Sequence, residues 1–473
     1  MMAGTPPAAA TAGPRHDTFS WRGLTLWPPR LAVEAVLRRK LARDVVYLQA
    51  SNAFQKGYSF VFSVVAVRTL GLSGYGDFLA ILTLYNTINL LGSLGLGQFL
   101  VVPLAQAAAA GDRETVAEAA GYNLKLSAII AAAVLLVTLA VGPQAGALII
   151  HRPDLGRLMR IVALSGIIAI AYNVSTTALQ ATRQMRDLAL VENVDMVLAK
   201  MLPIGPLLLG WGLPGLLWAT VAGEALSAVF ALRQYRRVAV GRHAFPDFPD
   251  LFRAAWRVPY RRYLRFTSWA AVDKNVAQFF GQTPVLFLSR WAGAEQVGLF
   301  GVAAKVFTLL AALQGAASKV FSVRLAQELA TNGPAATRRF FWRSTLFWGA
   351  TFAVASLVFL GLLPVFRWVY GPDKLPSFLL VALFAGYTAK QGFTVSLGAI
   401  FLTMNRVATN ALAKLPLMAL ALPLGAYLVQ RWGAVGAAAY QLGAYLLGDV
   451  MYFAIIATPW FWKNEKRKTK NEE

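Results

Sequence analysis

The stretch "RTLGLSGYGDF", residues 68–78, separates two long apolar segments with an arginine, glycines and an aspartate. A closely similar stretch, "RWAGAEQVGLF", returns at residues 290–300. Because this spacing is close to half of the 473-residue chain, the pattern predicts an internal duplication. Four residues keep their positions at one constant separation: Arg68, Gly71, Gly76 and Phe78 match Arg290, Gly293, Gly298 and Phe300.

Further matches follow at nearly the same separation along the rest of the chain. The tripeptide "LAQ" at residues 104–106 returns at residues 325–327. The ordered recurrence of such matches indicates that the two halves share one structural plan. Another set follows near the end of each half, where Trp211, Gly212 and Gly215 match Trp432, Gly433 and Gly436.

The composition is that of a membrane protein. Hydrophobic residues make up 57% of the chain and charged residues 14%, against about 25% charged residues in a soluble domain. A bilayer core of about 30 Å requires about 20 apolar residues per helix. Twelve such stretches are predicted, at residues 46–70, 77–102, 122–145, 158–181, 188–209, 213–232, 264–288, 299–322, 341–363, 376–402, 408–429 and 434–457.

The predicted fold is therefore an all-α polytopic membrane protein, with about twelve transmembrane helices in two pseudo-symmetric six-helix lobes around a central cavity. Because each half has an even number of spans, the two halves insert with the same orientation. The predicted organisation is a basic Ala/Pro-rich leader at 1–45, an N-terminal lobe at 46–235, a basic linker at 236–263, a C-terminal lobe at 264–457 and a basic tail at 458–473.

The net charge of +23 lies mostly on one side of the predicted membrane. With both termini inside, the inner segments hold 29 Lys and Arg residues and the outer hairpins about 8. This bias predicts that both termini and the linker are cytoplasmic, and it argues against nucleic acid as a partner. Enzyme signals are weak, because there is no cysteine, no His metal spacing and no phosphate-binding loop. We therefore expect no catalytic residues, metal or cofactor.

Polar residues follow one helical face in several spans. In the first span, Asn52 and Lys56 lie on such a stripe. Lysines in hydrocarbon are costly unless they snorkel, pair or face water, so these stripes predict a wet, cationic substrate site. Arg68 and Arg290 lie at outer helix ends, where interfacial anchors or a gate are expected. The remaining substrate-binding candidates are Lys200, Lys274, Gln278, Lys305 and Lys390, and the candidates for ion or proton coupling are Asp273 and Glu224.

Three stretches carry a family resemblance: "VRTLGLSGYGDF" (67–78), "GSLGLGQFLV" (92–101) and "GAEQVGLFGVAAKV" (293–306). With the duplicated twelve-span plan, the chain resembles the Wzx-type polysaccharide flippases of the multidrug/oligosaccharidyl-lipid/polysaccharide (MOP) exporter superfamily. The resemblance implies alternating access and export of polyprenyl-diphosphate-linked oligosaccharide, a polysaccharide or lipopolysaccharide O-antigen precursor, across the bacterial inner membrane. It implies the bilayer, the lipid-linked oligosaccharide and polysaccharide-assembly proteins as partners.

Two other functions stay open at this point. A multidrug exporter of the same superfamily would favour an acidic, aromatic cavity for organic cations. A membrane glycosyltransferase or polysaccharide polymerase would require a large polar loop or a convergent acid/base cluster. The lysines on the polar stripes favour an anionic, lipid-linked substrate.

Overall fold

The computed structural model describes residues 40–92, 104–105, 107–108, 111–182, 184–241, 245–258, 275, 278–371, 376–404 and 406–462. Within these ranges the chain is helical and contains no strand. The described residues from Tyr47 onward belong to one compact unit. The predicted leader and tail lie outside the described residues, apart from the ends that adjoin the helices.

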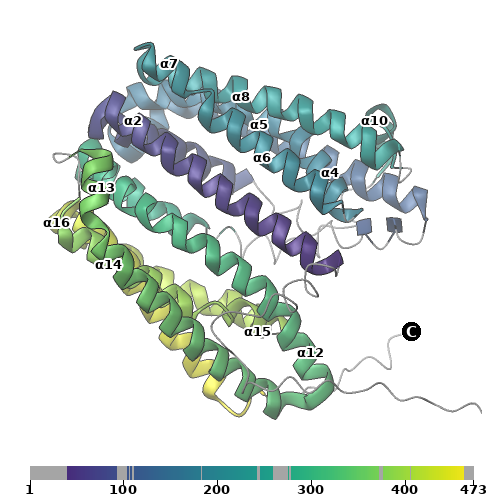
Figure 1. Cartoon of the computed structure of the whole chain (residues 1–473). Coiled ribbons are helices and arrows are strands. Elements are labelled where there is room, and N and C mark those ends of the chain that lie inside the picture. The colour runs from purple at the N-terminus through teal and green to yellow at the C-terminus, as the bar shows by residue number, and fades with distance from the viewer. Residues whose placement is uncertain are drawn as a thin grey trace, which may run out of the picture. The chain divides into compact units, whose positions relative to one another are not determined.

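The N-terminal lobe is built from long helices that pack against one another, some of them neighbours in sequence and others not (Figure 1). Proline and glycine set several of its boundaries, since Pro153 opens one helix and Gly210 and Gly212 adopt positive φ between two others. Its elements are α2 (Lys40–Gly92), α4 (Arg113–Ile150), α5 (Pro153–Ala181), α6 (Met185–Met201), α7 (Ile204–Leu208), α8 (Gly212–Gln234), the π-helix η2 (Tyr235–Val240) and α10 (Phe248–Arg257).

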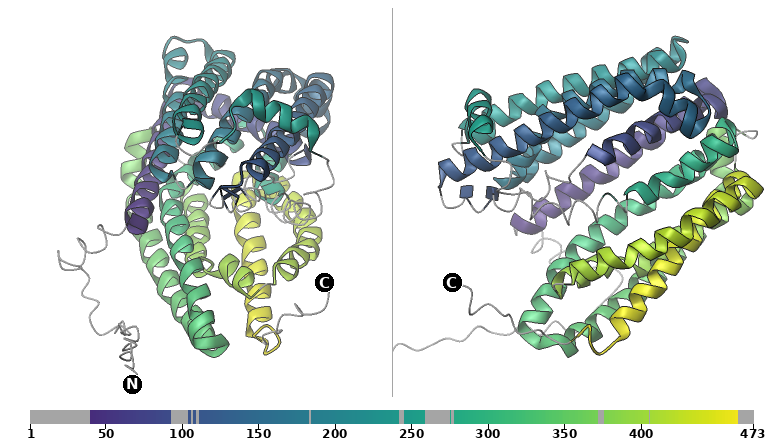
Figure 2. Two further views of the ribbon diagram at one scale, coloured as in Figure 1. Left: turned by 90° about the vertical axis from the view of Figure 1, so that its right-hand side faces the viewer. Right: turned by 180° about the vertical axis from the view of Figure 1, so that it is seen from behind.

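The C-terminal lobe repeats this arrangement, and its α12 runs beside α2 in the views of Figures 1 and 2. Helix 278–291 precedes α12. The other elements are α12 (Ala294–Gly361), α13 (Leu363–Tyr370), α14 (Phe378–Phe393), α15 (Leu397–Thr403) and α16 (Val407–Ala457).

Most predicted spans correspond to helices, but two of them are divided. The first part of the span predicted at 264–288 lies outside the described residues. The span predicted at 188–209 is divided into α6 and α7, next to Pro203, which cannot donate a backbone hydrogen bond. The span predicted at 376–402 is likewise divided between α14 and α15. Three long helices each run through two predicted spans that meet at a glycine with non-helical torsions: α2 at Gly71, α12 at Gly333 and α16 at Gly433. For α2 the second of these spans is described as far as Gly92.

The backbone itself carries the internal repeat. Glycine reaches positive φ without the steric cost that a Cβ imposes, and the positive-φ residues recur in corresponding places. Gly71 (φ 74°) corresponds to Gly293 (φ 87°) in the repeated motif. At the same or nearly the same separation, Gly111 corresponds to Gly333, Gly212 to Gly433 and His151 to Gly371. The duplication therefore extends from sequence to the turns between spans.

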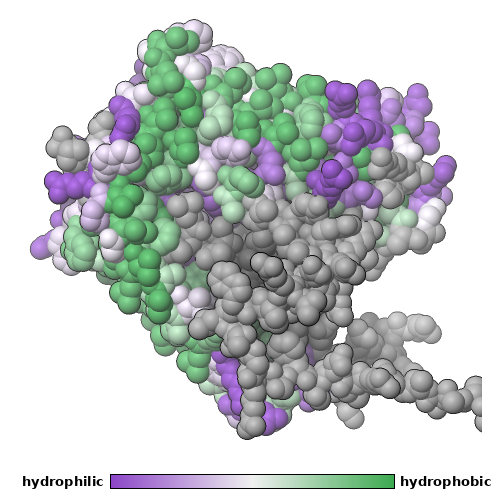
Figure 3. Space-filling model, viewed as in Figure 1, coloured by the Kyte–Doolittle hydropathy of each residue, from purple (hydrophilic) through white to green (hydrophobic). Residues whose placement is uncertain are grey.

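The surface of the described residues has the distribution expected of a protein in a bilayer. Seven helical stretches among these residues are long and apolar enough to cross a membrane. Large hydrophobic side chains such as Leu136, Leu148 and Val229 are exposed along them. In Figure 3, hydrophobic residues cover the middle of the N-terminal helices, and hydrophilic residues gather at the end where α10 lies. Hydrocarbon contact accounts for apolar exposure of this extent.

The buried side chains form one cluster shared by both lobes and further clusters confined to one lobe. The shared cluster joins Phe62 and Tyr75 of α2 to Val297 and Phe300 of α12. A second cluster, around Tyr122, belongs to the N-terminal lobe alone. A third is formed by residues of the C-terminal lobe, including Phe341, Phe401 and Phe461. The two lobes thus pack together through the part of α2 and α12 that flanks the repeated glycine motif.

Candidate functional site

The polar stripe of α2 is in contact with the C-terminal lobe, because a lysine of α12 reaches a side chain of this stripe. Lys56 and Ser59 are three residues apart and therefore lie on one helical face. The Lys305 Nζ of α12 donates a hydrogen bond of 2.9 Å to the Ser59 Oγ. The charges of Lys56 and Lys200 also act on Lys305. Three of the predicted substrate-binding lysines are therefore brought together by α2, α6 and α12.

Lys200 comes from the last turn of α6, and acidic groups of the same lobe balance its charge. Its Nζ lies 5.4 Å from the centre of the Phe62 ring, in a cation–π contact. It also interacts electrostatically with Glu224 and with Asp195. Glu224 is the predicted coupling residue, so the structure brings it to the lysines. Asp195 is a second acidic member of this cluster.

A close approach of two helices brings Glu224 to Lys200. A Cβ at Gly223 of α8 would overlap the Leu198 carbonyl oxygen of α6, so only glycine permits this spacing. On the other side of α6, the Ser51 hydroxyl donates a hydrogen bond of 2.9 Å to the Asn193 Oδ1, which joins α2 to α6. Backbone proximity and a polar contact thus fix α6 between α2 and α8. We refer to Lys56, Lys200, Lys305, Asp195 and Glu224 as the lysine cluster.

Lys390 has a different environment from the members of the lysine cluster. Its Nζ lies 2.7 Å from the Asp449 Oδ2, and both side chains are buried, with 9% and 13% of their surfaces exposed. The same ammonium lies 4.9 Å from the centre of the Tyr445 ring and 5.7 Å from that of Tyr387. Lys390 was predicted as a substrate ligand, and the structure makes it one half of an ion pair within the C-terminal lobe.

The repeated glycine motif forms a tight contact between the two lobes. A Cβ at Gly76 would overlap the Ala294 carbonyl oxygen, and a Cβ at Gly298 would overlap the Leu72 carbonyl oxygen. In the alignment of the two halves, Gly298 corresponds to Gly76 and Ala294 to Leu72. The contact is therefore self-complementary, as in an interface related by a twofold axis. Glycine at both positions allows the backbone of α2 to contact the backbone of α12 directly.

The arginines of the motif also reach across to the opposite lobe. Arg68 donates from Nε to the Val369 carbonyl oxygen at 2.9 Å and from Nη2 to that of Trp368 at 3.2 Å. Arg290 donates from Nη1 to the Leu148 carbonyl oxygen and, at 3.3 Å, to that of Ile149. These acceptors lie in the last turns of α13 and α4, where carbonyls lack helical partners and favour a cation. The two arginines thus make equivalent contacts with opposite lobes.

Other predicted residues lie apart or cannot be placed. Asn52 is partly buried on α2, one turn before Lys56, and Gln278 is exposed at the start of helix 278–291. Lys274 and Asp273 lie outside the described residues, so their predicted roles stay predictions. Sequence reasoning did not predict that Asp449 is the partner of Lys390. In the sequence, these two residues stand out only as charged residues within apolar spans, and no pattern there links one to the other.

Comparison with known proteins identifies the family and the fold. A model of the polysaccharide biosynthesis protein family matches residues 41–321, which is more than half of the chain. No curated protein matches the chain.

Solved transporters share the fold at low sequence identity. An inward-facing multidrug resistance MATE transporter of the MOP superfamily aligns with a TM-score of 0.63 and 16% identity, over 87% of this chain and 98% of that one. The lipid II flippase MurJ, in an inward closed conformation, aligns with a TM-score of 0.63 and 13% identity, over 87% and 88%.

A MOP superfamily transporter from Pyrococcus furiosus, described as having a binding pocket of reverse polarity, aligns with a TM-score of 0.61 and 15% identity, over 89% of this chain and 97% of that one. The fold is thus that of two-lobed MOP superfamily transporters. The duplicated helical plan and the family match lead to one conclusion: the chain belongs to the polysaccharide biosynthesis protein family.

Proposed function

We propose that this protein is a flippase that moves a polyprenyl-diphosphate-linked oligosaccharide across the bacterial inner membrane by alternating access. The observation that carries the proposal is the lysine cluster, which joins both lobes through the contact between Lys305 and Ser59. The family match and the similarity to the lipid II flippase MurJ support a lipid-linked substrate.

The charge balance of the lysine cluster suits a diphosphate. At their formal charges, the three lysines and two acidic residues of the cluster sum to one positive charge (3 − 2 = 1) before a substrate enters. Ammonium groups form short, charge-assisted hydrogen bonds with phosphate oxygens. In a site of reduced dielectric, opposite charges about 4 Å apart attract more strongly than they do in water. A diphosphate would therefore relieve the mutual repulsion of the lysines while its lipid tail stays in the bilayer.

The contacts between the lobes support an assignment of conformational state. The glycine motif and both arginines join the lobes at the end of the molecule that the charge bias assigns to the outside. Among the described residues, each of the other buried clusters is confined to one lobe. We propose that this structure is the state closed to the outside, and that the glycine contact with Arg68 and Arg290 forms the outer gate.

Export of organic cations is the strongest alternative, because MATE transporters share the fold. A cation site would require a carboxylate that no lysine neutralises. In the lysine cluster the lysines outnumber the acidic residues by three to two, and Asp449 is paired with Lys390. This excess of positive charge favours the anionic substrate over the cationic one.

The proposal is tested by deleting the gene and identifying what accumulates in the membrane. We expect a lipid-linked oligosaccharide to accumulate on the cytoplasmic leaflet, and the wild-type gene to clear it. A triple variant with Lys56→Ala, Lys200→Ala and Lys305→Ala should not clear it, whereas the matching triple Arg variant should clear part of it. A deletion strain with unchanged lipid-linked sugars but greater sensitivity to organic cations would favour the multidrug alternative.

A further inference from the structure

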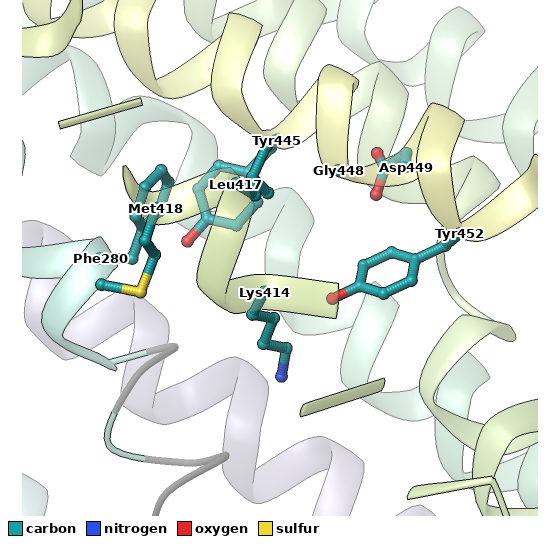
Figure 4. Close-up of a pocket in the computed structure, with 8 residues that line it drawn as sticks. All are labelled: Phe280, Lys414, Leu417, Met418, Tyr445, Gly448, Asp449 and Tyr452. Carbon is teal, nitrogen blue, oxygen red and sulfur yellow. The ribbon is translucent and has the colours of Figure 1, made fainter. Parts of the chain in front are cut away.

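The short helix α10, in the basic linker, exposes an aromatic surface that the described part of the chain leaves uncovered. Its Phe252 and Trp256 side chains are 59% and 74% exposed, and their ring centres lie 6.2 Å apart. In the C-terminal lobe, by contrast, the rings of Phe280, Tyr445 and Tyr452 line a small pocket between helices (Figure 4). At ten residues, α10 is about 15 Å long and cannot cross a bilayer core of about 30 Å. A position across the membrane therefore does not explain the exposed rings.

The side chains of α10 divide into three faces. Residues four positions apart lie about 40° from each other around a helix, and adjacent residues about 100°. One face is buried, one is exposed and aromatic, and one is exposed and basic. In that order, the pairs are Leu251 with Ala255, Phe252 with Trp256, and Arg253 with Arg257. The helix thus presents apolar and cationic side chains in two separate directions, while a third side contacts the protein.

Contacts with α4 fix the orientation of these faces. A Cβ at Gly121 of α4 would lie 2.9 Å from the Ala255 backbone nitrogen, so glycine permits α10 to pack closely there. Just beyond the end of α10, the Lys125 Nζ donates a hydrogen bond of 3.2 Å to the Val258 carbonyl oxygen. α10 is therefore held against α4 as part of the N-terminal lobe.

The contact with α4 also sets the depth of α10. Residues 113–120 of α4 include Arg113, Glu114 and Glu118, whereas the predicted span begins at residue 122. Gly121 lies between these parts, so α10 packs at the boundary between the charged and the apolar part of α4. Figure 3 shows hydrophilic residues gathered at this end of the lobe. Amphipathic helices bind at such a boundary, with their apolar face about 5–10 Å deep in the headgroup and acyl region.

The charge of the linker complements an anionic lipid surface. Residues 236–263 contain seven arginines and two aspartates, an excess of five positive charges. On α10 itself, Arg253 lies 3.3 Å from the exposed Asp250, and Arg257 forms no ion pair with any residue that the structure describes. Clusters of about four to eight basic residues at the cytoplasmic membrane surface bind anionic phospholipids.

We propose that α10 lies in the headgroup region of the leaflet that the charge bias assigns to the cytoplasm, and that it binds anionic phospholipid there. Phe252 and Trp256 insert among the upper acyl chains, and Arg253 and Arg257 contact the anionic headgroups. The depth of α10 along α4 favours lipid over a protein partner, because a protein would have to displace the bilayer at this level. The inference holds for any transported substrate. Anionic lipid that binds only the folded protein should stabilise it.

The depth of the aromatic face is tested with a fluorescent probe on single cysteines, since the chain has none of its own. Trp256→Cys places the probe on the aromatic face, and Asp250→Cys, the matched control, places it on the charged side of the same helix. Each labelled protein is placed alone in nanodiscs. Lipids brominated on their acyl chains should quench the first probe, and iodide in the water should quench the second.

Two results would overturn the insertion of this face into the bilayer. Equal quenching of both probes by iodide would place the aromatic face in water. Protection of the Trp256→Cys probe from both quenchers would show that protein, and not lipid, covers the face.

The preference for anionic lipid is tested by the unfolding temperature in nanodiscs of phosphatidylcholine, with and without phosphatidylglycerol. Phosphatidylglycerol should raise the wild-type unfolding temperature by about 2–4 °C, and high salt should weaken this rise by screening. Arg253→Gln with Arg257→Gln should lose about half of the rise or more. In phosphatidylcholine alone this double variant should unfold at the wild-type temperature, because both side chains are exposed. An equal rise in the double variant and the wild type would overturn the assignment of these arginines to anionic lipid.

Discussion

The Lys305 ammonium group of α12 donates a hydrogen bond of 2.9 Å to the Ser59 hydroxyl of α2, and these residues are 246 positions apart in the chain. This contact joins the polar faces of the two lobes within the lysine cluster. Because Lys305 comes from one lobe and Lys56 and Lys200 from the other, a substrate held by all three would contact both lobes. Substrate binding can then bias the equilibrium between conformations, since the lobes move relative to each other in alternating access.

Lys305→Ala should weaken substrate binding without unfolding the protein. Hydrogen bonds to charged groups contribute about 1.5–3 kcal/mol, so the half-saturating substrate concentration should rise by about 10- to 100-fold. Lys305→Arg should retain part of the affinity, because the charge remains. Ser59→Ala is the control, since it removes the partner hydroxyl and leaves the ammonium group. An unchanged half-saturating concentration in Lys305→Ala would remove this residue from the substrate site.

Gly298→Ala should prevent the outer gate from closing, because its Cβ would overlap the Leu72 carbonyl oxygen. Gly361→Ala is the matched control on the same helix, since nothing lies near its Cβ position. The chain has no cysteine, so a single Thr308→Cys, one turn from Lys305, can report access to the site.

The measurement is the labelling rate of that cysteine by a membrane-impermeant thiol reagent added from outside the cell. Labelling should be faster in Gly298→Ala than in the wild type and unchanged in Gly361→Ala. Equal labelling in all three proteins would mean that the glycine contact does not control access from outside.

Removing both arginines should open the outer gate further than removing either one. Arg68 and Arg290 bond to carbonyl oxygens of opposite lobes. Each hydrogen bond to a neutral acceptor should stabilise the closed state by about 0.5–1.5 kcal/mol. Each arginine bonds to two carbonyl oxygens, so Arg68→Gln with Arg290→Gln removes four such bonds. The double variant should therefore shift the equilibrium toward the outward-open state by about 2–6 kcal/mol.

The same cysteine assay measures this shift. Each single variant should shift the free energy of the equilibrium by about half as much as the double variant does. Arg431→Gln is the control, because Arg431 contacts the Tyr427 ring within its own helix. If the double variant labels at the wild-type rate, the arginines only anchor the helix ends at the membrane surface.

Breaking the ion pair between Lys390 and Asp449 should destabilise the C-terminal lobe. Removing one partner leaves a buried charge without compensation, which costs about 3–5 kcal/mol. Asp449→Ala should therefore lower the unfolding temperature in detergent, and Lys390→Met with Asp449→Leu should recover much of the loss. Asp250→Ala breaks the exposed pair with Arg253 and should change stability by less than about 1 kcal/mol. Equal stability of Asp449→Ala and the wild type would contradict a structural role for the pair.

The sequence predicted the helical elements and the repeat because both follow from local patterns. Apolar length sets the spans, and the glycines at 71 and 293 mark the turns between them. Helical spacing also placed Lys56 on a polar face. Helical spacing could not predict the interaction partners of these side chains. Arg68 bonds to carbonyl oxygens of the opposite lobe, and Lys390 bonds to a carboxylate on another helix. Such pairs depend on how helices pack, which periodicity does not determine. The breaks next to Pro203 and after α14 were missed, because hydrophobicity continues through both.

We propose that the lysine cluster carries a lipid diphosphate across the membrane. The most direct test uses purified protein in proteoliposomes containing a fluorescent polyprenyl-diphosphate oligosaccharide, with an outside enzyme that modifies only sugars exposed on the outer leaflet. Wild-type protein should make the inner pool accessible, and the Lys56→Ala, Lys200→Ala, Lys305→Ala triple variant should not, although it folds and inserts. Movement of the lipid by the triple variant at the wild-type rate would show that the lysine cluster does not carry the diphosphate.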